Sequence, residues 1–222
     1  MNASMLRSAR RRRLAGTILA LAAALARTSH ASGPDATRFS LVPNPAFVRC
    51  LAAFPDDPSR PPSAIVTVRR GRLNDQMEVS LRNVKPGLAF DLFTVERTPF
   101  LVDGDPDPDF QPKGFGLAWY QSDLEVRNDH RNETTIRTVL LDQIFGLDSS
   151  VGLAPTNTFH VGFWFDAPAD AAPCGFAGAP TPFNGRHDAG PLAMISLPDA
   201  KTNLGPLCAN PDLSTDPVRC NP

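Results

Sequence analysis

The chain contains 222 residues, 42% of them hydrophobic, and its formal net charge is −1 at neutral pH. That length is enough for one substantial domain with its own hydrophobic core. Six of the 22 Lys and Arg residues precede residue 32, so the rest of the chain has 16 of them against 23 Asp and Glu, a net charge of −7. A mildly acidic surface does not attract polyanions, which argues against nucleic acid as a partner.

Residues 1–31 have the three-part pattern of a cleavable secretory signal peptide. The parts are a basic region with Arg7 and Arg10–Arg13, an apolar run from Leu14 to Ala26, and the small residues of Ser29-His30-Ala31. An apolar run of about thirteen residues is too short to span a bilayer. We therefore expect cleavage near Ala31, a secreted or periplasmic protein, and no transmembrane segment afterwards. General secretion is favoured over twin-arginine export, and a retained membrane anchor is the alternative.

Residues 32–200 are predicted to form an antiparallel all-β domain, because short apolar runs alternate with polar residues between turn signals. In QMEVSLRNV, for example, Met77, Val79 and Leu81 face one way and the residues between them face the other. Strands are predicted at 64–69, 77–84, 88–97, about 115–126, 134–142, 158–166 and 190–197, with an edge strand within 32–49. No amphipathic helix of about twelve or more residues is evident.

The strand spacing and the long Pro-rich loops are typical of a β-sandwich, either immunoglobulin-like or jelly-roll-like, with about seven or eight strands. A closed barrel would produce much the same pattern. The core is expected to contain the face formed by Phe159, Val161, Phe163 and Phe165. Residues 201–222 are predicted to be an irregular tail that a disulfide holds in place.

All four cysteines follow the predicted signal peptide, and an even number in an oxidising compartment indicates two disulfides. Of the three pairings, we favour Cys50–Cys174, which would tie the first strand to a late loop, and Cys208–Cys220, which would pin the tail. The rival interpretation is a metal site or a catalytic thiol. No C-x-x-C spacing supports it, and no histidine lies near a cysteine in sequence.

VDGDPDPDF, residues 102–110, is the densest acidic segment. Its aspartates are Asp103, Asp105, Asp107 and Asp109. A calcium site needs six to eight oxygens that converge on one point, whereas Pro106 and Pro108 keep the residues before them extended. The segment is therefore interpreted as a stiff, solvated loop. Calcium is the one cofactor that the sequence leaves open, with Asp123 or Asp129 as further ligands.

A second metal hypothesis rests on His160, His187 and Asp188, which would give two imidazoles and a carboxylate for zinc or iron. The spacing is long and uninformative, so structural imidazoles bonded to backbone carbonyls are favoured. Trp119, Tyr120 and Trp164 are candidates for an aromatic platform that stacks on sugar rings, although half of the rings on the strands of a sandwich must be core.

The sequence contains no nucleophile motif such as G-x-S-x-G, and paired carboxylates cannot be assigned from spacing alone. The leading hypothesis is therefore a secreted, non-enzymatic binding or structural module of the bacterial envelope or exterior, with a protein or a glycan as its ligand. One alternative is a metal-dependent hydrolase or oxidase that uses His160, His187 and Asp188. Another is a carbohydrate-binding module that uses Trp119 and Trp164.

Overall fold

The structure is a computed structural model that describes residues 36–71, 74–111, 114–116, 118–127, 133–141, 159–179 and 188–221. The chain divides into two units, Met1–Ser32 and Gly33–Pro222. The predicted signal peptide and its cleavage point lie outside the described residues. Within the part of the chain that is described, no helix has the length and apolar character needed to cross a membrane.

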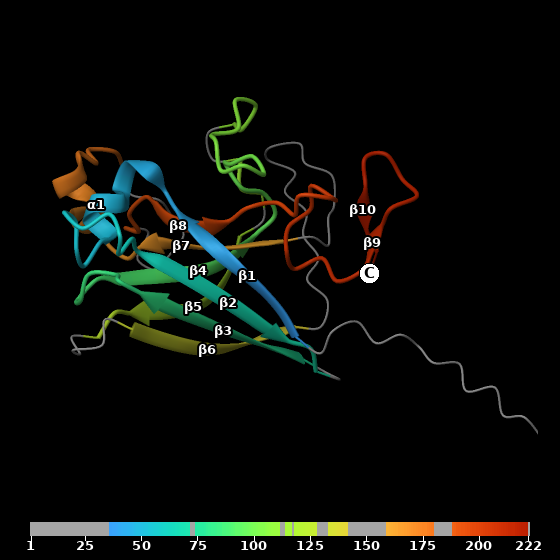
Figure 1. Ribbon diagram of the computed structural model, residues 1–222, viewed down its shortest axis with the longest axis horizontal. Helices are drawn as coiled ribbons and strands as arrows, with labels where there is room; N and C mark the ends of the chain where they lie inside the picture. Colours follow the sequence, from blue (N-terminus) through green and yellow to red (C-terminus); the bar gives the residue numbers. More distant parts are fainter. Residues whose placement is uncertain are drawn as a thin grey trace, which may run out of the picture. The chain divides into compact units, whose positions relative to one another are not determined.

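Eight antiparallel strands form one continuous sheet (Figure 1). They are β1 (Ala36–Pro43), β2 (Ser63–Arg69), β3 (Asn74–Arg82), β4 (Ala89–Val95), β5 (Ala118–Glu125), β6 (Glu133–Leu141), β7 (His160–Phe165) and β8 (Leu192–Ser196). Their order across the sheet is β5-β4-β7-β8-β1-β2-β3-β6. The outermost strands approach each other, since the hydroxyl of Thr138 on β6 donates to the carbonyl oxygen of Gln121 on β5 at 3.3 Å. The arrangement is therefore nearly barrel-like, and the antiparallel all-β prediction is confirmed.

The strand that was expected at an edge, within 32–49, lies in the interior of the sheet. β1 pairs with β2, where Phe39 lies opposite Val66, and with β8, where Val42 lies opposite Ile195. The expectation was wrong because hydrophobic alternation shows which face of a strand is buried but carries no information on which strands flank it. The predicted β2–β3 hairpin is confirmed.

One face of the sheet encloses the inner core, to which strands far apart in the sequence contribute. Phe159, Val161, Phe163 and Phe165 all belong to it and are fully buried, as predicted. The rings of Phe90 and Phe163 lie with their centroids 4.8 Å apart. Burying a ring of this size contributes about 1.5–3 kcal/mol to stability.

The opposite face of β4, β7 and β8 is also buried, under the loop of residues 97–116. This outer cluster comprises Phe93, Val95, Phe100, Trp164, Leu192 and Ile195. Phe115 from the loop packs edge-on against Trp164, with centroids 5.1 Å apart. All six residues of β7 are therefore buried, because the loop covers the face that would otherwise meet solvent.

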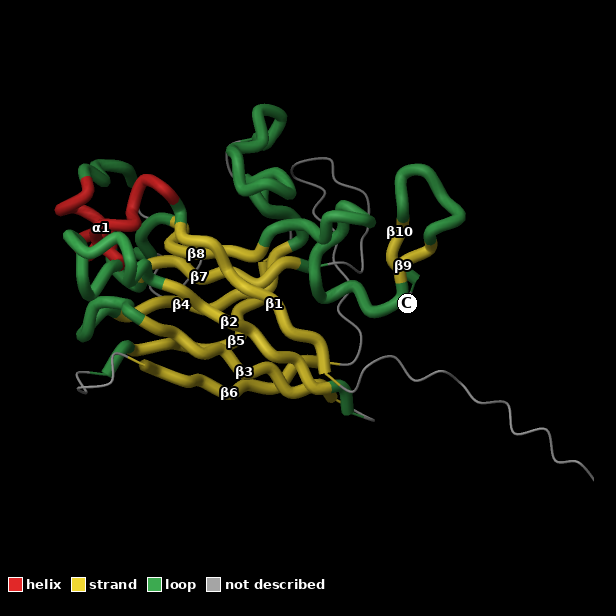
Figure 2. Tube along the Cα trace, in the orientation of Figure 1, coloured by secondary structure: helices red, strands yellow, loops and turns green. Residues whose placement is uncertain are grey.

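Short helices close one end of the sheet (Figure 2). They are the 3-10 helix η1 (Pro45–Phe47), α1 (Val48–Leu51), α2 (Pro168–Ala171) and the 3-10 helix η2 (Ala172–Cys174). The predicted disulfide Cys50–Cys174 is present, but it joins α1 to η2 and not the first strand to a loop, because the chain turns into short helices after β1. The second predicted disulfide, Cys208–Cys220, is also present, and it holds the two-stranded ribbon of β9 (Pro211–Asp212) and β10 (Arg219–Cys220).

Arg70 of the β2–β3 hairpin connects an ion pair within the hairpin to the C-terminal segment. Arg70 pairs with Asp75, which is fully buried and also accepts a hydrogen bond from the backbone N–H of Gly71 at 3.0 Å. The same guanidinium donates to the carbonyl oxygen of Leu207 at 3.1 Å. The N–H of Leu207 also donates to the carbonyl oxygen of Phe159 at 3.3 Å, so Leu207 is held between the hairpin and the beginning of β7.

Candidate functional site

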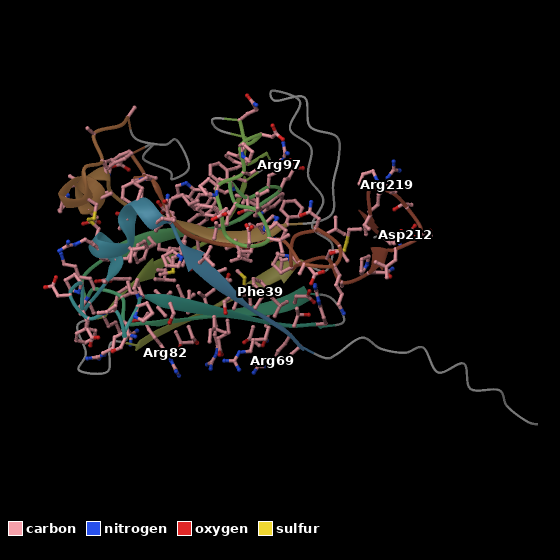
Figure 3. All side chains as sticks on the ribbon, turned by 45° about the horizontal axis from the view of Figure 1, so that its top comes forward. Phe39, Arg69, Arg82, Arg97, Asp212 and Arg219 are labelled. Atoms are coloured by element: carbon pink, nitrogen blue, oxygen red, sulfur yellow. A yellow bond between two sulfur atoms is a disulfide. The ribbon has the colours of Figure 1, made fainter. Side chains whose placement is uncertain are left out.

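A pocket of about 190 Å³ lies where β4 ends and β7 begins. We call it the end pocket. Its walls come from the first residue of β7, from the 97–116 loop and from residues 198–205. Among the described residues, its polar lining comprises Glu96, Arg97, Thr98, Asp107, His160 and Asn203. Figure 3 shows Arg97 among the side chains that gather around the loop. Three parts of the chain that are distant in sequence, 96–107, His160 and 198–205, therefore meet at one polar cavity.

His160 is 4% exposed and occupies a defined orientation at the start of β7. Its Nδ1 lies 3.1 Å from the carbonyl oxygen of Ser196. A carbonyl oxygen can only accept, so Nδ1 carries the hydrogen and Nε2 retains the lone pair. Burial lowers the pKa of His160 to about 4, and the hydrogen bond to Ser196 acts in the opposite direction. At neutral pH the ring is therefore an uncharged hydrogen-bond acceptor at Nε2.

Glu96 directly follows β4 and is 4% exposed. Its carboxylate lies against the backbone of Gly116, which has a φ of +73°. A Cβ at residue 116 would lie 2.1 Å from Glu96 Oε2, so only glycine leaves room for the carboxylate. The backbone N–H of Arg97 donates to the carbonyl oxygen of Phe115 at 3.0 Å, which fixes the two ends of the loop together. The loop thus holds the acid in place.

Thr98 is 7% exposed and lines the same cavity. Its Oγ1 is buried and has no hydrogen-bond partner among the described residues. A buried hydroxyl without a partner costs about 1–3 kcal/mol. Because most buried polar groups in native structures are satisfied, this hydroxyl calls for a functional explanation.

The aspartate loop is a series of local turns, and only one of its carboxylates lines the end pocket. Asp103 Oδ1 accepts from the N–H of Asp105 at 3.1 Å, and Asp107 Oδ1 accepts from the N–H of Asp109 at 2.9 Å. Asp107 is half-buried and lines the end pocket, whereas the other three carboxylates are exposed. The acids therefore stabilise turns, as is typical of Asp beside Pro and Gly.

The opposite wall of the pocket is also fixed by its own hydrogen bonds. Asp199 Oδ1 accepts from the N–H groups of Lys201 and Thr202, each at 3.0 Å, and these bonds lower the pKa of Asp199. Asn203 has a positive φ of 57° and donates its N–H to the carbonyl oxygen of Asp199 at 2.8 Å. The backbone of this wall is therefore held in place by hydrogen bonds within residues 199–203.

The predicted metal sets are only partly within the described residues. No group of three His, Cys, Asp or Glu side chains in the described ranges could hold a metal ion. Asp188 is half-buried, and His187 and Asp129 lie outside the described residues, so the His160, His187 and Asp188 set remains a prediction. His160 bonds to a backbone carbonyl, which is the structural role that the sequence favoured.

The three residues of the predicted aromatic platform do not share one exposed face. Trp164 is 1% exposed and belongs to the outer cluster, because the 97–116 loop covers it. Trp119 and Tyr120 are 50% and 47% exposed. They are neighbours on β5, opposite Thr94 and Phe93 respectively, so their side chains project to opposite faces of the strand.

Tyr120 is attached to its surroundings at both ends of its side chain. Its ring packs edge-on against Phe93 at 5.6 Å, and its hydroxyl donates to Asp123 Oδ1 at 2.8 Å. Burial, followed by this hydrogen bond, raises the pKa of Tyr120 to about 12. Tyr120 is therefore partly a packing residue, which leaves Trp119 as the more accessible of the two rings.

Sequence reasoning identified His160 and Asp107 as candidates but missed Glu96 and Thr98. Glu96 follows a run of alternating apolar residues, and Thr98 precedes Pro99, so both resemble ordinary residues of a strand end. One weak signal was available in the sequence: Glu96 directly follows a mostly apolar run, where an acid can be enclosed at the end of a buried strand. Comparison with known proteins found no matching family model, curated protein or solved structure.

Proposed function

We propose that this chain is an exported, non-enzymatic binding module of the bacterial envelope or exterior, which holds a small polar ligand in the end pocket. The observation that carries this proposal is the convergence of Glu96, Thr98 and His160 on one cavity. Each of these side chains is more than nine-tenths buried. The Thr98 hydroxyl has no hydrogen-bond partner among the described residues, so a ligand that hydrogen-bonds to it would offset the cost of burying it.

A binding role fits the site better than acyl transfer. His160 Nδ1 also lies 3.1 Å from Ser196 Oγ, which resembles a nucleophile beside a base. That nitrogen carries a hydrogen because it also faces a carbonyl oxygen, so it cannot accept the serine proton. Ser196 is 1% exposed, and its Oγ accepts the N–H of Val161 at 3.1 Å. The pair therefore serves to orient the imidazole.

The fold supports a rigid carrier for such a site. The inner core joins Val79 and Leu81 of β3 to Phe90 and Phe163 across the barrel, so opposite walls pack as the two layers of a sandwich do. The two disulfides agree with an oxidising compartment outside the cytoplasm. Export and the sandwich-like layering form part of the same proposal.

The proposal is tested by a ligand-observed NMR screen of the exported, disulfide-bonded protein with a library of small polar fragments. We expect binders whose signals are lost in Glu96→Gln, a variant that keeps the size of the side chain and removes its charge. Asp109→Asn, which removes an exposed carboxylate from the same loop, serves as the matched control and should retain every binder. A screen without any Glu96-dependent binder would refute the proposed function.

A further inference from the structure

We propose that the open edge of β1 is a second binding site, which adds an extended peptide of about five residues with an acidic residue at its centre to the sheet. The site is separate from the end pocket and goes beyond the binding role given above. Three features lead to it: an interrupted strand ladder, a cleft at the interruption and an arginine without a partner on the open edge.

The ladder between β1 and β8 covers only the last part of β1. β1 pairs with β2 over residues 36–41, whereas its pairing with β8 is confined to residues 41–43 (Figure 1). Asn44 donates its N–H to the carbonyl oxygen of Ala193 at 2.8 Å, so the even-numbered residues of β1 direct their main-chain groups toward the β8 side. The N–H and the carbonyl oxygen of Arg38 therefore point into the space beyond the end of β8.

The main chain of Arg38 has no partner on this side. Outside the strand ladders, no hydrogen bond to its N–H or carbonyl oxygen is found in the part of the chain that the structure describes. Arg38 and Ser40 are exposed, so these groups face solvent. An open edge with free N–H and C=O groups is a template on which a further strand can pair.

A cleft of about 620 Å³ lies along this edge. β1 contributes one wall with Arg38 and Phe39, and the C-terminal segment contributes Pro206 and Leu213. The lining is mainly apolar, and Leu213 is 71% exposed, so it has apolar surface to offer a partner. The volume falls within the range of roughly 300–1,000 Å³ that is typical of ligand sites. The open edge therefore has both room and apolar contacts beside it.

The C-terminal wall of the cleft is fixed, which favours a peptide over a second copy of the chain. Leu207 is bonded through its carbonyl oxygen to Arg70 and through its N–H to Phe159. A wall that is already ordered lowers the entropy that binding costs. Because the same segment stands beside β1 in every copy, edge-to-edge pairing of two copies would bring two such segments into one cleft.

Arg38 determines the character of the peptide. In an added antiparallel strand, the residue opposite Arg38 exchanges both main-chain hydrogen bonds with it and has its side chain on the same face. No ion pair of the Arg38 guanidinium is found among the described residues, so an acidic residue fits opposite it. Of the other charged residues in the described lining, Asp199 accepts hydrogen bonds within its own turn, and Lys201 adds a second cation. The residues on either side of the acid project to the face of Phe39, where apolar side chains suit the lining.

Titration calorimetry of the exported, disulfide-bonded protein tests the proposal with the peptide acetyl-Ser-Val-Glu-Val-Ser-amide. Its glutamate is designed to lie opposite Arg38 and its valines beside Phe39. We expect saturable binding, which becomes about tenfold weaker when the glutamate nitrogen is methylated, because the hydrogen bond to the Arg38 carbonyl oxygen is lost. Absence of saturable binding, or equal affinity for the methylated peptide, overturns the proposal.

A charge variant separates the arginine from the general charge of the surface. Arg38→Gln should weaken the glutamate peptide severalfold and leave the affinity of the corresponding glutamine peptide unchanged. Arg69→Gln removes an exposed cation from the neighbouring strand and should leave both affinities unchanged. Equal weakening in the two variants would show that Arg38 does not select the acid, and the proposed peptide chemistry would be wrong.

Amide hydrogen exchange shows where the peptide lies. The N–H of Arg38 should exchange rapidly in the protein alone and slowly with the peptide bound, whereas the N–H of Phe39, which points toward β2, should be protected in both states. Binding without slower exchange at Arg38 would place the peptide on another surface and overturn the proposal. Protection of Arg38 without peptide, together with a dimer in size-exclusion chromatography, would make a second copy the occupant and overturn it as well.

Discussion

His160 shows how one buried residue determines the chemistry of its surroundings. The strand alternation in TFHVGFWFD placed it on the face opposite Phe159, Val161 and Phe163, and this placement is confirmed. Its partner could not be predicted, because Ser196 lies 36 residues away on a strand whose position in the sheet was unknown. The sequence therefore predicted the face on which the imidazole lies, and the tautomer follows only from the three-dimensional contact.

The first prediction concerns the pH dependence of stability. The pKa of His160 is about 4 in the folded protein and about 6.5 in the unfolded chain. The neutral imidazole therefore contributes fully to the free energy of unfolding above pH 6.5, and this contribution is lost as the pH falls toward 4. The free energy of unfolding should therefore fall by about 3 kcal/mol over this window. Denaturant titrations between pH 4.5 and 7.5 would measure the change.

His160→Gln provides the comparison, because glutamine can donate to the Ser196 carbonyl oxygen and does not titrate. The wild-type protein should lose more stability than this variant on acidification. The pKa values of Asp57, Asp199 and Asp212 are lowered from their ordinary value of 3.8, so the stability that these groups contribute is lost mainly below the pH window of the experiment. Parallel pH profiles for the two proteins would contradict the buried neutral imidazole.

At the scale of elements, the 97–116 loop differs most from its sequence-based interpretation. The alternation of Asp and Pro indicated a stiff, solvated loop, and the turns at Asp103 and Asp107 agree with local stiffness. Yet the same loop packs Phe100 and Phe115 into the outer cluster and places Thr98 in the end pocket. Isolated aromatic residues within a polar segment have no period, so pattern analysis could not show which face they cover.

The second element-scale feature, the β2–β3 hairpin, permits a sharp test. Asp75 is fully buried, pairs with Arg70 and accepts the N–H of Gly71. Removing one partner of a buried ion pair leaves an uncompensated charge, so Asp75→Asn should lower the free energy of unfolding by about 3–5 kcal/mol. The loss also releases Arg70 from Leu207, so amide hydrogen exchange should increase in residues 199–207.

The ion pair between Glu78 and Arg137 is the matched control, because it also joins neighbouring strands but is exposed on the arginine side. Glu78→Gln should cost under about 1 kcal/mol, as is usual for surface pairs. Equal losses in the two variants, measured by denaturant unfolding, would show that the Arg70–Asp75 pair contributes no more to stability than a surface ion pair.

At the scale of the whole molecule, the two disulfides constrain very different lengths of chain. Cys50–Cys174 joins residues 124 positions apart, across most of the sheet, and Cys208–Cys220 joins residues 12 positions apart. Both pairings were predicted from the cysteine positions, Cys208–Cys220 because it pins the tail onto itself and Cys50–Cys174 because it connects an early part of the domain to a late one. The strand order between them could not be predicted, because each side of β1 had several equivalent partners.

Removal of each disulfide gives the last prediction. Chain-entropy arguments give a loss of about 5 kcal/mol for Cys50→Ala with Cys174→Ala, and about 3 kcal/mol for Cys208→Ala with Cys220→Ala. Since domains of this size have about 5–15 kcal/mol of stability, the first double variant should unfold at a far lower denaturant concentration. Because Cys50 lies in the inner core and Cys208–Cys220 closes a peripheral ribbon, the ligand affinity of the second variant should be unchanged. A larger loss for the second variant would mean that the tail, and not the long closure across the sheet, holds the fold together.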